Sequence, residues 1–224
     1  MTARNQKEHT KAEIERGEGI LFSIRIVINV LYALMIFQIF LILPRPGDPE
    51  LAYLTLPQVY GEHINQLLVM VVGMILTVMY WIQFNIQMGN LVRSSVVHAS
   101  LALTQMVFLM LYLYFLRFDM EFDGMKLALQ MESVFLALAG FVAAFNWRYA
   151  RIKHLTSDQI TTKEELGIFY KILPEPLASA FSFPFAGFGP NIWSLAFLVI
   201  IPISYILGTV RKKQEAKLED VSTN

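Results

Sequence analysis

The sequence predicts an all-α, polytopic membrane protein with six transmembrane helices and with both termini in the cytoplasm. Two features of the composition indicate this class: 55% of the 224 residues are hydrophobic and only 16% are charged. The third is that the apolar residues occur in long runs, since a helix needs roughly 20 mostly apolar residues to cross a bilayer. Soluble domains of this length rarely contain such runs.

Six apolar segments follow one another along the chain. We expect them to form transmembrane helices at residues 20–43, 64–87, 96–117, 125–147, 174–188 and 191–208. Together they make one domain, 20–208, between an N-terminal tail at 1–19 and a C-terminal tail at 209–224. The first tail lacks the apolar stretch and small-residue cleavage site of a signal peptide, so we expect the first segment to stay in the membrane.

Each segment is bounded by residues that interrupt an apolar helix. Pro44 and Pro46 close the first segment, because proline cannot continue a helix. The sequence GNLVRSS separates the second from the third, and the acidic turn FDMEFD separates the third from the fourth. The fourth ends in NWRYARIKH, which leads into a polar linker with a short amphipathic helix. The fifth is short and contains Pro184, which fits a broken or re-entrant helix as well as a crossing.

Lys and Arg are concentrated in alternate connections, and this excess is typical of the cytoplasmic side of a membrane protein. The N-terminal tail, the linker after the fourth segment and the C-terminal tail hold most of them, whereas the other connections are mainly acidic. This bias places both termini in the cytoplasm, and the even number of segments agrees with it. The formal net charge is zero, so the composition does not indicate a nucleic-acid partner.

The sequence offers few residues for catalysis. It contains no Cys, which excludes thiolate metal sites and a catalytic thiol. Its four His residues are scattered without the spacing of metal ligands, and it has no glycine-rich phosphate loop and no nucleophile elbow. We therefore expect no enzymatic activity, no metal site and no cofactor.

Polar residues in the first segment divide its helix into two faces. At 3.6 residues per turn, Arg25, Asn29 and Tyr32 share one stripe. The roughly opposite stripe consists of Val27, Val30, Leu34, Gln38 and Leu41. Polar residues within a membrane usually face a bundle interior or water. Two simpler explanations stay open: Arg25 could extend to the cytoplasmic surface, and Asn29 and Gln38 could hold helices together through hydrogen bonds.

Two further features of the apolar segments bear on function. Glu132 lies in the fourth segment, where a lone carboxylate is costly unless it is paired or protonated. It could serve a cation path, or it could be reached by water from the outer side. Aromatic residues near segment ends, Trp81 among them, are typical anchors at the membrane interface.

The order of the segments, from about Arg25 to Leu207, resembles the transmembrane protein 175 family of endolysosomal and bacterial potassium channels. The most specific match is YWIQFNIQMGNLVRSS, which is similar to the family's second helix and the basic turn after it. The sequence NWRYARIKHLTSDQI is similar to the Trp-Arg-Tyr-Ala end of the family's fourth helix. Bacterial members of the family carry one six-helix repeat per chain and assemble as tetramers, with the first helix of each subunit lining the pore.

The match to the family's signature is incomplete. The first helix of the family carries an Arg followed by Phe-Ser-Asp, whereas here Arg25 is followed by Asn29, which stands in place of the acid. Histidines of the family's second helix match Phe84 and Asn85. The resemblance implies that Arg25, Asn29 and Asn85 form a polar network that bonds the first helix to its neighbours and sets its angle.

The resemblance also implies which residues face the pore. With Asn29 as the anchor of the alignment, the pore-facing positions are Leu34, Gln38 and Leu41, which lie on the second stripe described above. Family members use rings of Ile or Leu there as an apolar constriction. A Gln in the middle ring would hydrate this constriction and change gating or selectivity.

From the resemblance we expect a passive, potassium-favouring cation channel formed by a homotetramer in the cell membrane, which for a bacterial-type member is the inner membrane. Its partners would be potassium or other monovalent cations, the lipid bilayer and further copies of the chain. Two alternatives stay open. A diverged relative that lacks the signature could be a non-conducting membrane scaffold, and Glu132 could instead serve a proton-coupled carrier.

Overall fold

The computed structural model describes residues 11–41, 56–122 and 125–223, with side chains described except at 40, 56–69 and 217–223. Every regular element within these ranges is a helix, which confirms the all-α prediction. The end of the predicted first span, at 42–43, and the outermost residues of both tails lie outside the described residues.

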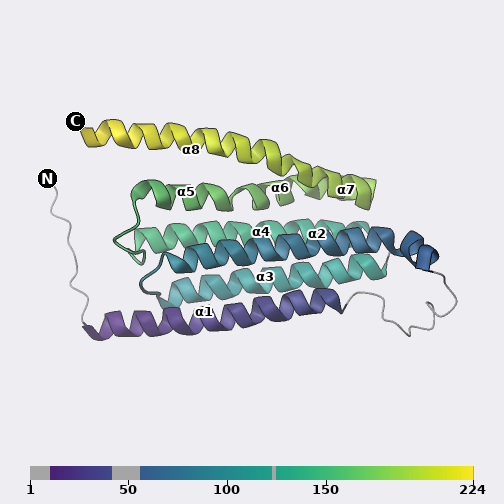
Figure 1. Ribbon diagram of the computed structural model, residues 1–224, viewed down its shortest axis with the longest axis horizontal. Coiled ribbons are helices and arrows are strands. Elements are labelled where there is room, and N and C mark those ends of the chain that lie inside the picture. The colour runs from purple at the N-terminus through teal and green to yellow at the C-terminus, as the bar shows by residue number, and fades with distance from the viewer. Residues whose placement is uncertain (1–10, 42–55, 123–124, 224) are drawn as a thin grey trace.

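The helices form an elongated bundle (Figure 1). In chain order they are α1 (Lys11–Phe40), α2 (Leu56–Gly89), α3 (Val96–Glu121), α4 (Lys126–Ile152), α5 (Thr162–Ile172), α6 (Pro174–Ser182), the 3-10 helix η1 (Phe183–Phe188), α7 (Pro190–Ala196), the 3-10 helix η2 (Phe197–Val199) and α8 (Ile200–Thr223). The start of α1 and the end of α8 lie at the same end of the bundle (Figure 1).

Five helical units are long and apolar enough to cross a membrane, and this number fits a membrane protein. They are α1 from Lys11 to Ile39, α2 from Met70 to Gly89, α3, α4, and the run from Pro190 to Ala216 through α7, η2 and α8. The predicted fifth span, 174–188, is not among them, because it consists of the short α6 and η1. Pro174, Pro176 and Pro184 each lack a backbone donor, which favours short pieces over one continuous helix.

The helices α5, α6 and η1 follow one another along the bundle. They run from the end where α4 finishes to the end where α7 begins (Figure 1). A single residue, Leu173, separates α5 from α6. The polar segment that the sequence predicted as a surface linker therefore contributes, through α5, to a broken helical path along the bundle.

Several helices extend beyond the predicted spans, and α1 and α8 extend furthest. Helix α1 begins at Lys11, well before residue 20, and α8 continues to Thr223, through the predicted C-terminal tail. Both extensions are rich in Ala, Glu, Lys and Arg, which have high helix propensity. Ion pairs at i,i+4 spacing support them, Lys11 with Glu15 at 3.8 Å and Arg211 with Glu215 at 3.2 Å.

The core lies between α3 and α4, which form the most extensive helix pair, and the inner sides of α1 and α2. Among its largest fully buried side chains are the aromatic residues Tyr80 and Trp147, whose polar atoms are hydrogen-bonded. Tyr80 Oη donates to the carbonyl O of Leu136 at 2.9 Å. Trp147 Nε1 donates to the carbonyl O of Glu165 at 3.0 Å, which ties α5 to the end of α4. These bonds satisfy polar groups that are costly to bury unpaired.

Gly140 allows a close approach between three helices of this core. A Cβ placed on Gly140 would lie 2.7 Å from Pro176 Cβ on α6 and 2.7 Å from Tyr80 Oη on α2. Small residues at helix contacts let backbones approach in this way in membrane proteins. The position therefore holds α2, α4 and α6 together without room for a side chain.

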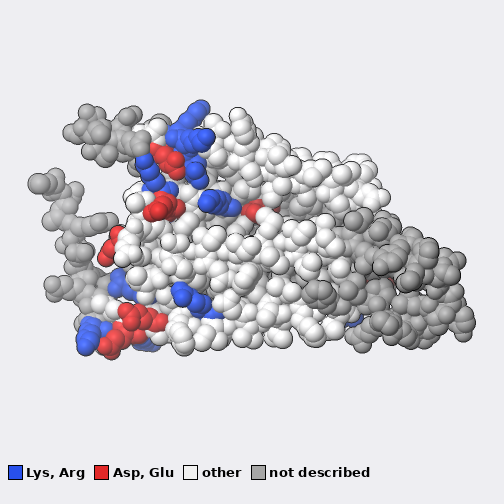
Figure 2. Space-filling view, in the orientation of Figure 1, with Lys and Arg blue, Asp and Glu red and all other residues white. Residues whose placement is uncertain are grey.

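Charged side chains are unevenly distributed along the bundle. On the visible face most of the described Lys, Arg, Asp and Glu side chains gather at the end that holds the start of α1 and the end of α8 (Figure 2). The described surface along the middle of the bundle is almost free of charge (Figure 2). An uncharged band beside a charged end is the pattern expected where a bundle meets lipid and then water.

Candidate functional site

Helix α1 has two faces in different surroundings. On the side toward the bundle, Ile28, Tyr32, Met35 and Ile39 are buried. We call the opposite stripe, Val27, Val30, Leu34, Gln38 and Leu41, the outer face of α1. Leu34 keeps 53% and Leu41 46% of its surface exposed, and Gln38 between them is exposed as well. The described part of the protomer leaves this face uncovered, so the Gln38 amide is open to water, lipid or another chain.

Two polar residues of α1, Arg25 and Asn29, bind α2. Trp81 Nε1 donates to Asn29 Oδ1 at 2.8 Å, and Asn29 Nδ2 donates to the carbonyl O of Arg25 at 2.9 Å. Arg25 Nη2 donates to the carbonyl O of Met88 at 2.6 Å, in the last turn of α2, where carbonyl groups lack partners within the helix. A cation is favourable at this helix end. We call Arg25, Asn29 and Trp81 the α1–α2 clamp.

Asn85, the third residue of the predicted polar network, lies beside the clamp on α2. Its Nδ2 donates to the carbonyl O of Trp81 at 2.9 Å, one turn earlier on the same helix. No hydrogen bond joins Asn85 to α1 among the described residues. The structure therefore brings Arg25 and Asn29 together and places Asn85 on the neighbouring helix without a direct bond to either.

Trp81 is the member of the clamp that sequence reasoning missed, because its ring was interpreted only as an interface anchor. A chemical signal for this contact was present in the sequence. The indole N–H of Trp81 can only donate a hydrogen bond, and Asn29 in the first segment offers an amide oxygen as acceptor. Phe84, one turn further along α2, also contacts α1. Its ring packs against Tyr32 with 6.0 Å between the ring centroids. The two helices are thus joined by polar and aromatic contacts at adjacent turns.

Replacing Trp81 with Phe should loosen α1 from α2, because Asn29 Oδ1 loses its donor while the aromatic packing is kept. The expected loss of unfolding free energy is about 0.6 kcal/mol, typical of a hydrogen bond between membrane helices. Unfolding in detergent with Asn29→Leu, Trp81→Phe and the double variant measures the coupling. The pair Asn85→Leu and Trp81→Phe is the control, because Asn85 bonds only the Trp81 backbone. Additive losses for Asn29 and Trp81 would contradict the clamp.

Three of the described carboxylates are buried inside the bundle, away from the outer face of α1: Asp119, Glu132 and Glu175. Glu132 on α4 is fully buried, and neither of its oxygens has a hydrogen-bond partner among the described residues. It lies within electrostatic reach of Asp119 and Tyr112 on α3. Glu175, in the first turn of α6, is 6% exposed, and Gln83 of α2 hydrogen-bonds its side chain. A buried carboxylate of this kind binds a proton or a cation.

Glu175 was not singled out from the sequence. The signal for it is an acid between two prolines, Pro174 and Pro176, at the start of a helix that begins inside the bundle. Buried helix starts of this type are common where membrane proteins hold ions or polar substrates. Glu175 therefore joins Glu132 as a second buried carboxylate of interest.

A small hydroxyl network fixes α4, α6 and α7 beside Glu132. Trp193 Nε1 donates to Ser133 Oγ at 2.8 Å. The hydroxyl groups of Ser133 and Ser182 share a hydrogen bond of 2.9 Å, and Ser182 donates to the carbonyl O of Ser179 at 2.8 Å. All of these side chains except Trp193 are small, which lets α6 pack directly on α4.

The described residues contain no group of three or more His, Cys, Asp or Glu side chains that could hold a metal ion. His98, for example, is buried and hydrogen-bonded through Nδ1 to Ser94 Oγ at 2.9 Å, at the start of α3. No family model, curated protein or solved structure matches the chain. The function is therefore inferred from the outer face of α1, the clamp and the buried carboxylates.

Proposed function

We propose that the chain forms a passive, potassium-favouring cation channel in which α1 of each protomer lines the pore of a homotetramer. The observation that carries this proposal is the uncovered outer face of α1, where Gln38 lies exposed between the apolar Leu34 and Leu41. An amide in contact with lipid is costly, so a face of this composition is better satisfied by water or by neighbouring chains. The preference for potassium and the number of subunits come from the family resemblance.

In this arrangement each residue of the outer face has a distinct role. Leu34 and Leu41 form apolar rings that narrow the pore, and Gln38 forms a polar ring that keeps water between them. Apolar rings alone would tend to exclude water and close the path. The α1–α2 clamp holds the other side of α1 against the bundle, and it thereby fixes the angle at which the outer face meets the pore axis.

We further propose that the chain crosses the membrane six times with both termini in the cytoplasm, in a bacterial inner membrane. The fifth crossing would be made by α5, α6 and η1 together rather than by residues 174–188 alone. The start of α1 and the end of α8 lie at one end of the bundle (Figure 1), and this supports an even number of crossings. The gathering of Lys and Arg at that end supports its placement in the cytoplasm (Figure 2).

Reconstitution in liposomes tests the proposal. Vesicles that contain the purified protein and a potassium gradient should release potassium faster than empty vesicles, and faster than they take up sodium under the same gradient. The assembled oligomer should be verified by cross-linking in the same vesicles. Impermeable vesicles that hold the assembled protein would contradict the channel and would favour a scaffold.

A second candidate, a proton-coupled carrier, is favoured by one observation: the fully buried Glu132, whose oxygens have no hydrogen-bond partner among the described residues. A carrier predicts uptake that saturates with substrate and stops with Glu132→Gln, which removes the proton site but keeps the volume. Glu121→Gln, at the exposed end of α3, is the matched control and should leave uptake unchanged. Flux that does not saturate and survives Glu132→Gln would exclude this candidate.

A further inference from the structure

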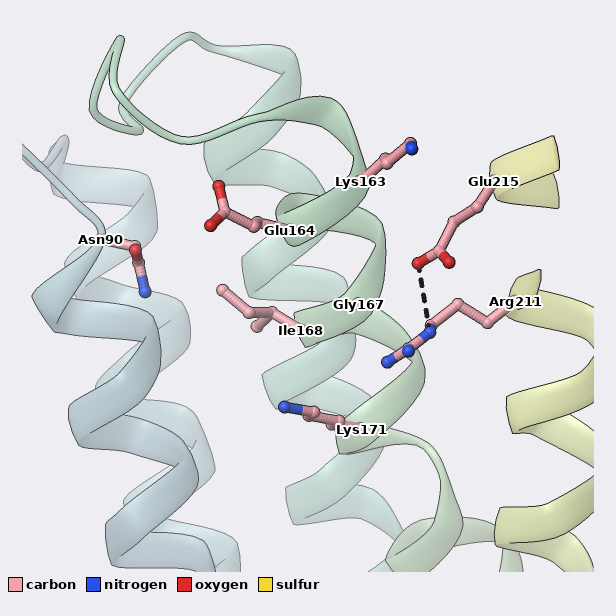
Figure 3. A pocket seen from close by; sticks show the side chains of 8 residues that line it. All are labelled: Asn90, Lys163, Glu164, Gly167, Ile168, Lys171, Arg211 and Glu215. Atoms are coloured by element: carbon pink, nitrogen blue, oxygen red, sulfur yellow. Dashed lines mark ion pairs between the residues drawn. The ribbon is translucent and has the colours of Figure 1, made fainter. Parts of the chain in front are cut away.

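A pocket opens between α2, α5 and α8, at the charged end of the bundle (Figure 3). Its volume is about 350 Å³, and the residues that decide its chemistry are Asn90, Glu164, Gly167, Lys171, Arg211 and Glu215. The wall on α5 lacks a side chain at Gly167, and a Cβ there would lie 3.7 Å from Arg211 Nη1. The guanidinium group of Arg211 therefore reaches across from α8 to α5, as Figure 3 shows.

The two carboxylates that line this pocket are already engaged. Glu164 accepts hydrogen bonds from the Thr161 backbone N–H at 2.8 Å and from its hydroxyl at 2.9 Å, in a capping box that starts α5. Glu215 pairs with Arg211 Nε at 3.2 Å. Neither acid needs an additional cation from a ligand.

Two of the cations that line the pocket, Lys171 and Arg211, have donor groups left for a ligand. Lys171 is exposed and has no hydrogen-bond or ion-pair partner among the described residues. Arg211 pairs with Glu215 through Nε alone, which leaves the two terminal nitrogens of a rigid donor fork for another acceptor. A guanidinium fork beside a lysine is a favourable pair for the oxygens of a phosphate group.

The depth of the pocket indicates where such a phosphate would come from. Arg211 follows directly on the apolar part of α8, and the pocket lies at the end of the bundle where charges gather (Figure 2). Side chains at this level meet the headgroups of the bilayer, and basic pockets between membrane helices are suited to anionic headgroups. Asn90 at the end of α2 adds an amide on the opposite wall.

We propose that this pocket binds a phosphate group, that of an anionic phospholipid headgroup, between Lys171 and Arg211. The bound headgroup joins α5 and α8 and so stabilises the outermost helix, α8, which buries few of its residues in the protomer. The proposal holds whether or not the chain conducts ions, since it involves neither the outer face of α1 nor the clamp.

Thermal unfolding of the full chain in detergent, titrated with short-chain phosphatidylglycerol, tests the site. The lipid should raise the unfolding temperature, and the double variant Lys171→Gln/Arg211→Gln should weaken its apparent affinity about thirtyfold, at about fivefold for each cation. The matched control Lys212→Gln/Lys213→Gln removes the same charge from exposed positions of α8 outside the pocket. It should change the affinity less than twofold.

A second variant guards against misfolding of the first. Gly167→Leu fills the pocket without changing any charge, and it should also abolish the stabilisation by phosphatidylglycerol. Equal stabilisation by phosphatidylglycerol and phosphatidylcholine, or equal losses in the pocket and control variants, would overturn the proposal. Stabilisation by inorganic phosphate alone, lost in the pocket variants, would overturn the lipid source and assign the site to a soluble anion.

Discussion

Substituting Gln38 with Leu should lower the cation flux of the reconstituted protein by about tenfold or more. In the proposed tetramer the change replaces four amides with four apolar side chains in the ring between Leu34 and Leu41. Three adjacent apolar rings favour loss of water from the pore, and each 1.4 kcal/mol added to the barrier reduces the flux tenfold. Potassium release from liposomes, normalised to the amount of assembled protein, measures the effect.

The matched control for this prediction is Gln214→Leu. It makes the same chemical change at an exposed position of α8 beyond its apolar part, and it should leave the flux unchanged. Because the Gln38 side chain is exposed and makes no hydrogen bond to the described residues, its replacement should not reduce the stability of the fold. An unaltered flux in the Gln38→Leu protein would show that this residue does not line the conducting path.

Adding one methyl group at Gly140 should cause a large loss of stability. The new Cβ would lie 2.7 Å from Pro176 Cβ and from Tyr80 Oη, so α6 and α2 must both move away from α4. Neither neighbour can rotate away easily, because Pro176 belongs to a rigid ring and Tyr80 is bonded to Leu136. Gly140→Ala should therefore lower the unfolding free energy by about 1–3 kcal/mol.

Gly208→Ala provides the comparison for Gly140→Ala. Gly208 lies in α8, where a Cβ would meet no atom within 4 Å. The same substitution in open space should be neutral or stabilising, since Ala favours a helix by up to about 1 kcal/mol over Gly. Denaturant titration in detergent separates the two, and equal stability of both variants would contradict the close packing of α2, α4 and α6.

Helical phase in the sequence was enough to divide α1 into its two faces, because 3.6 residues per turn fixes which side chains share a side. It placed Tyr32 on the same side as Asn29, and the structure buries Tyr32 and bonds Asn29 to α2. Phase does not identify the partner across the contact. Trp81 as the donor to Asn29 therefore emerged only once α1 and α2 were placed side by side.

The hydropathy of the sequence also does not predict that α5 and α6 follow one another with a break between them. An apolar window sees 174–188 as a short separate segment and the preceding residues as a polar linker. The structure joins the two into one path along the bundle, because Glu165 is bonded by Trp147 and Arg151 at the end of α4 and holds α5 there. This arrangement also carries Glu175 to its buried position, which a count of apolar residues cannot show.

The outer face of α1 and the buried carboxylates lead to different paths for ions. The first would lie between chains, on the axis of the proposed tetramer, whereas the second would lie within one chain. Substitutions of Gln38 test the first path and substitutions of Glu132 test the second, because Gln38 is exposed on the outer face of α1 whereas Glu132 is buried on α4. A single set of flux measurements with both variants therefore distinguishes a channel from a carrier.

The absence of Cys from the sequence allows the central claim to be tested most directly, by a single cysteine in place of Gln38. A positively charged, water-soluble methanethiosulfonate should modify this cysteine from the pore and block potassium flux. The control cysteine replaces Gln214, which is exposed on α8 beyond its apolar part, and its modification should leave the flux intact. Flux that persists after complete modification of the cysteine at position 38 would contradict a pore lined by α1.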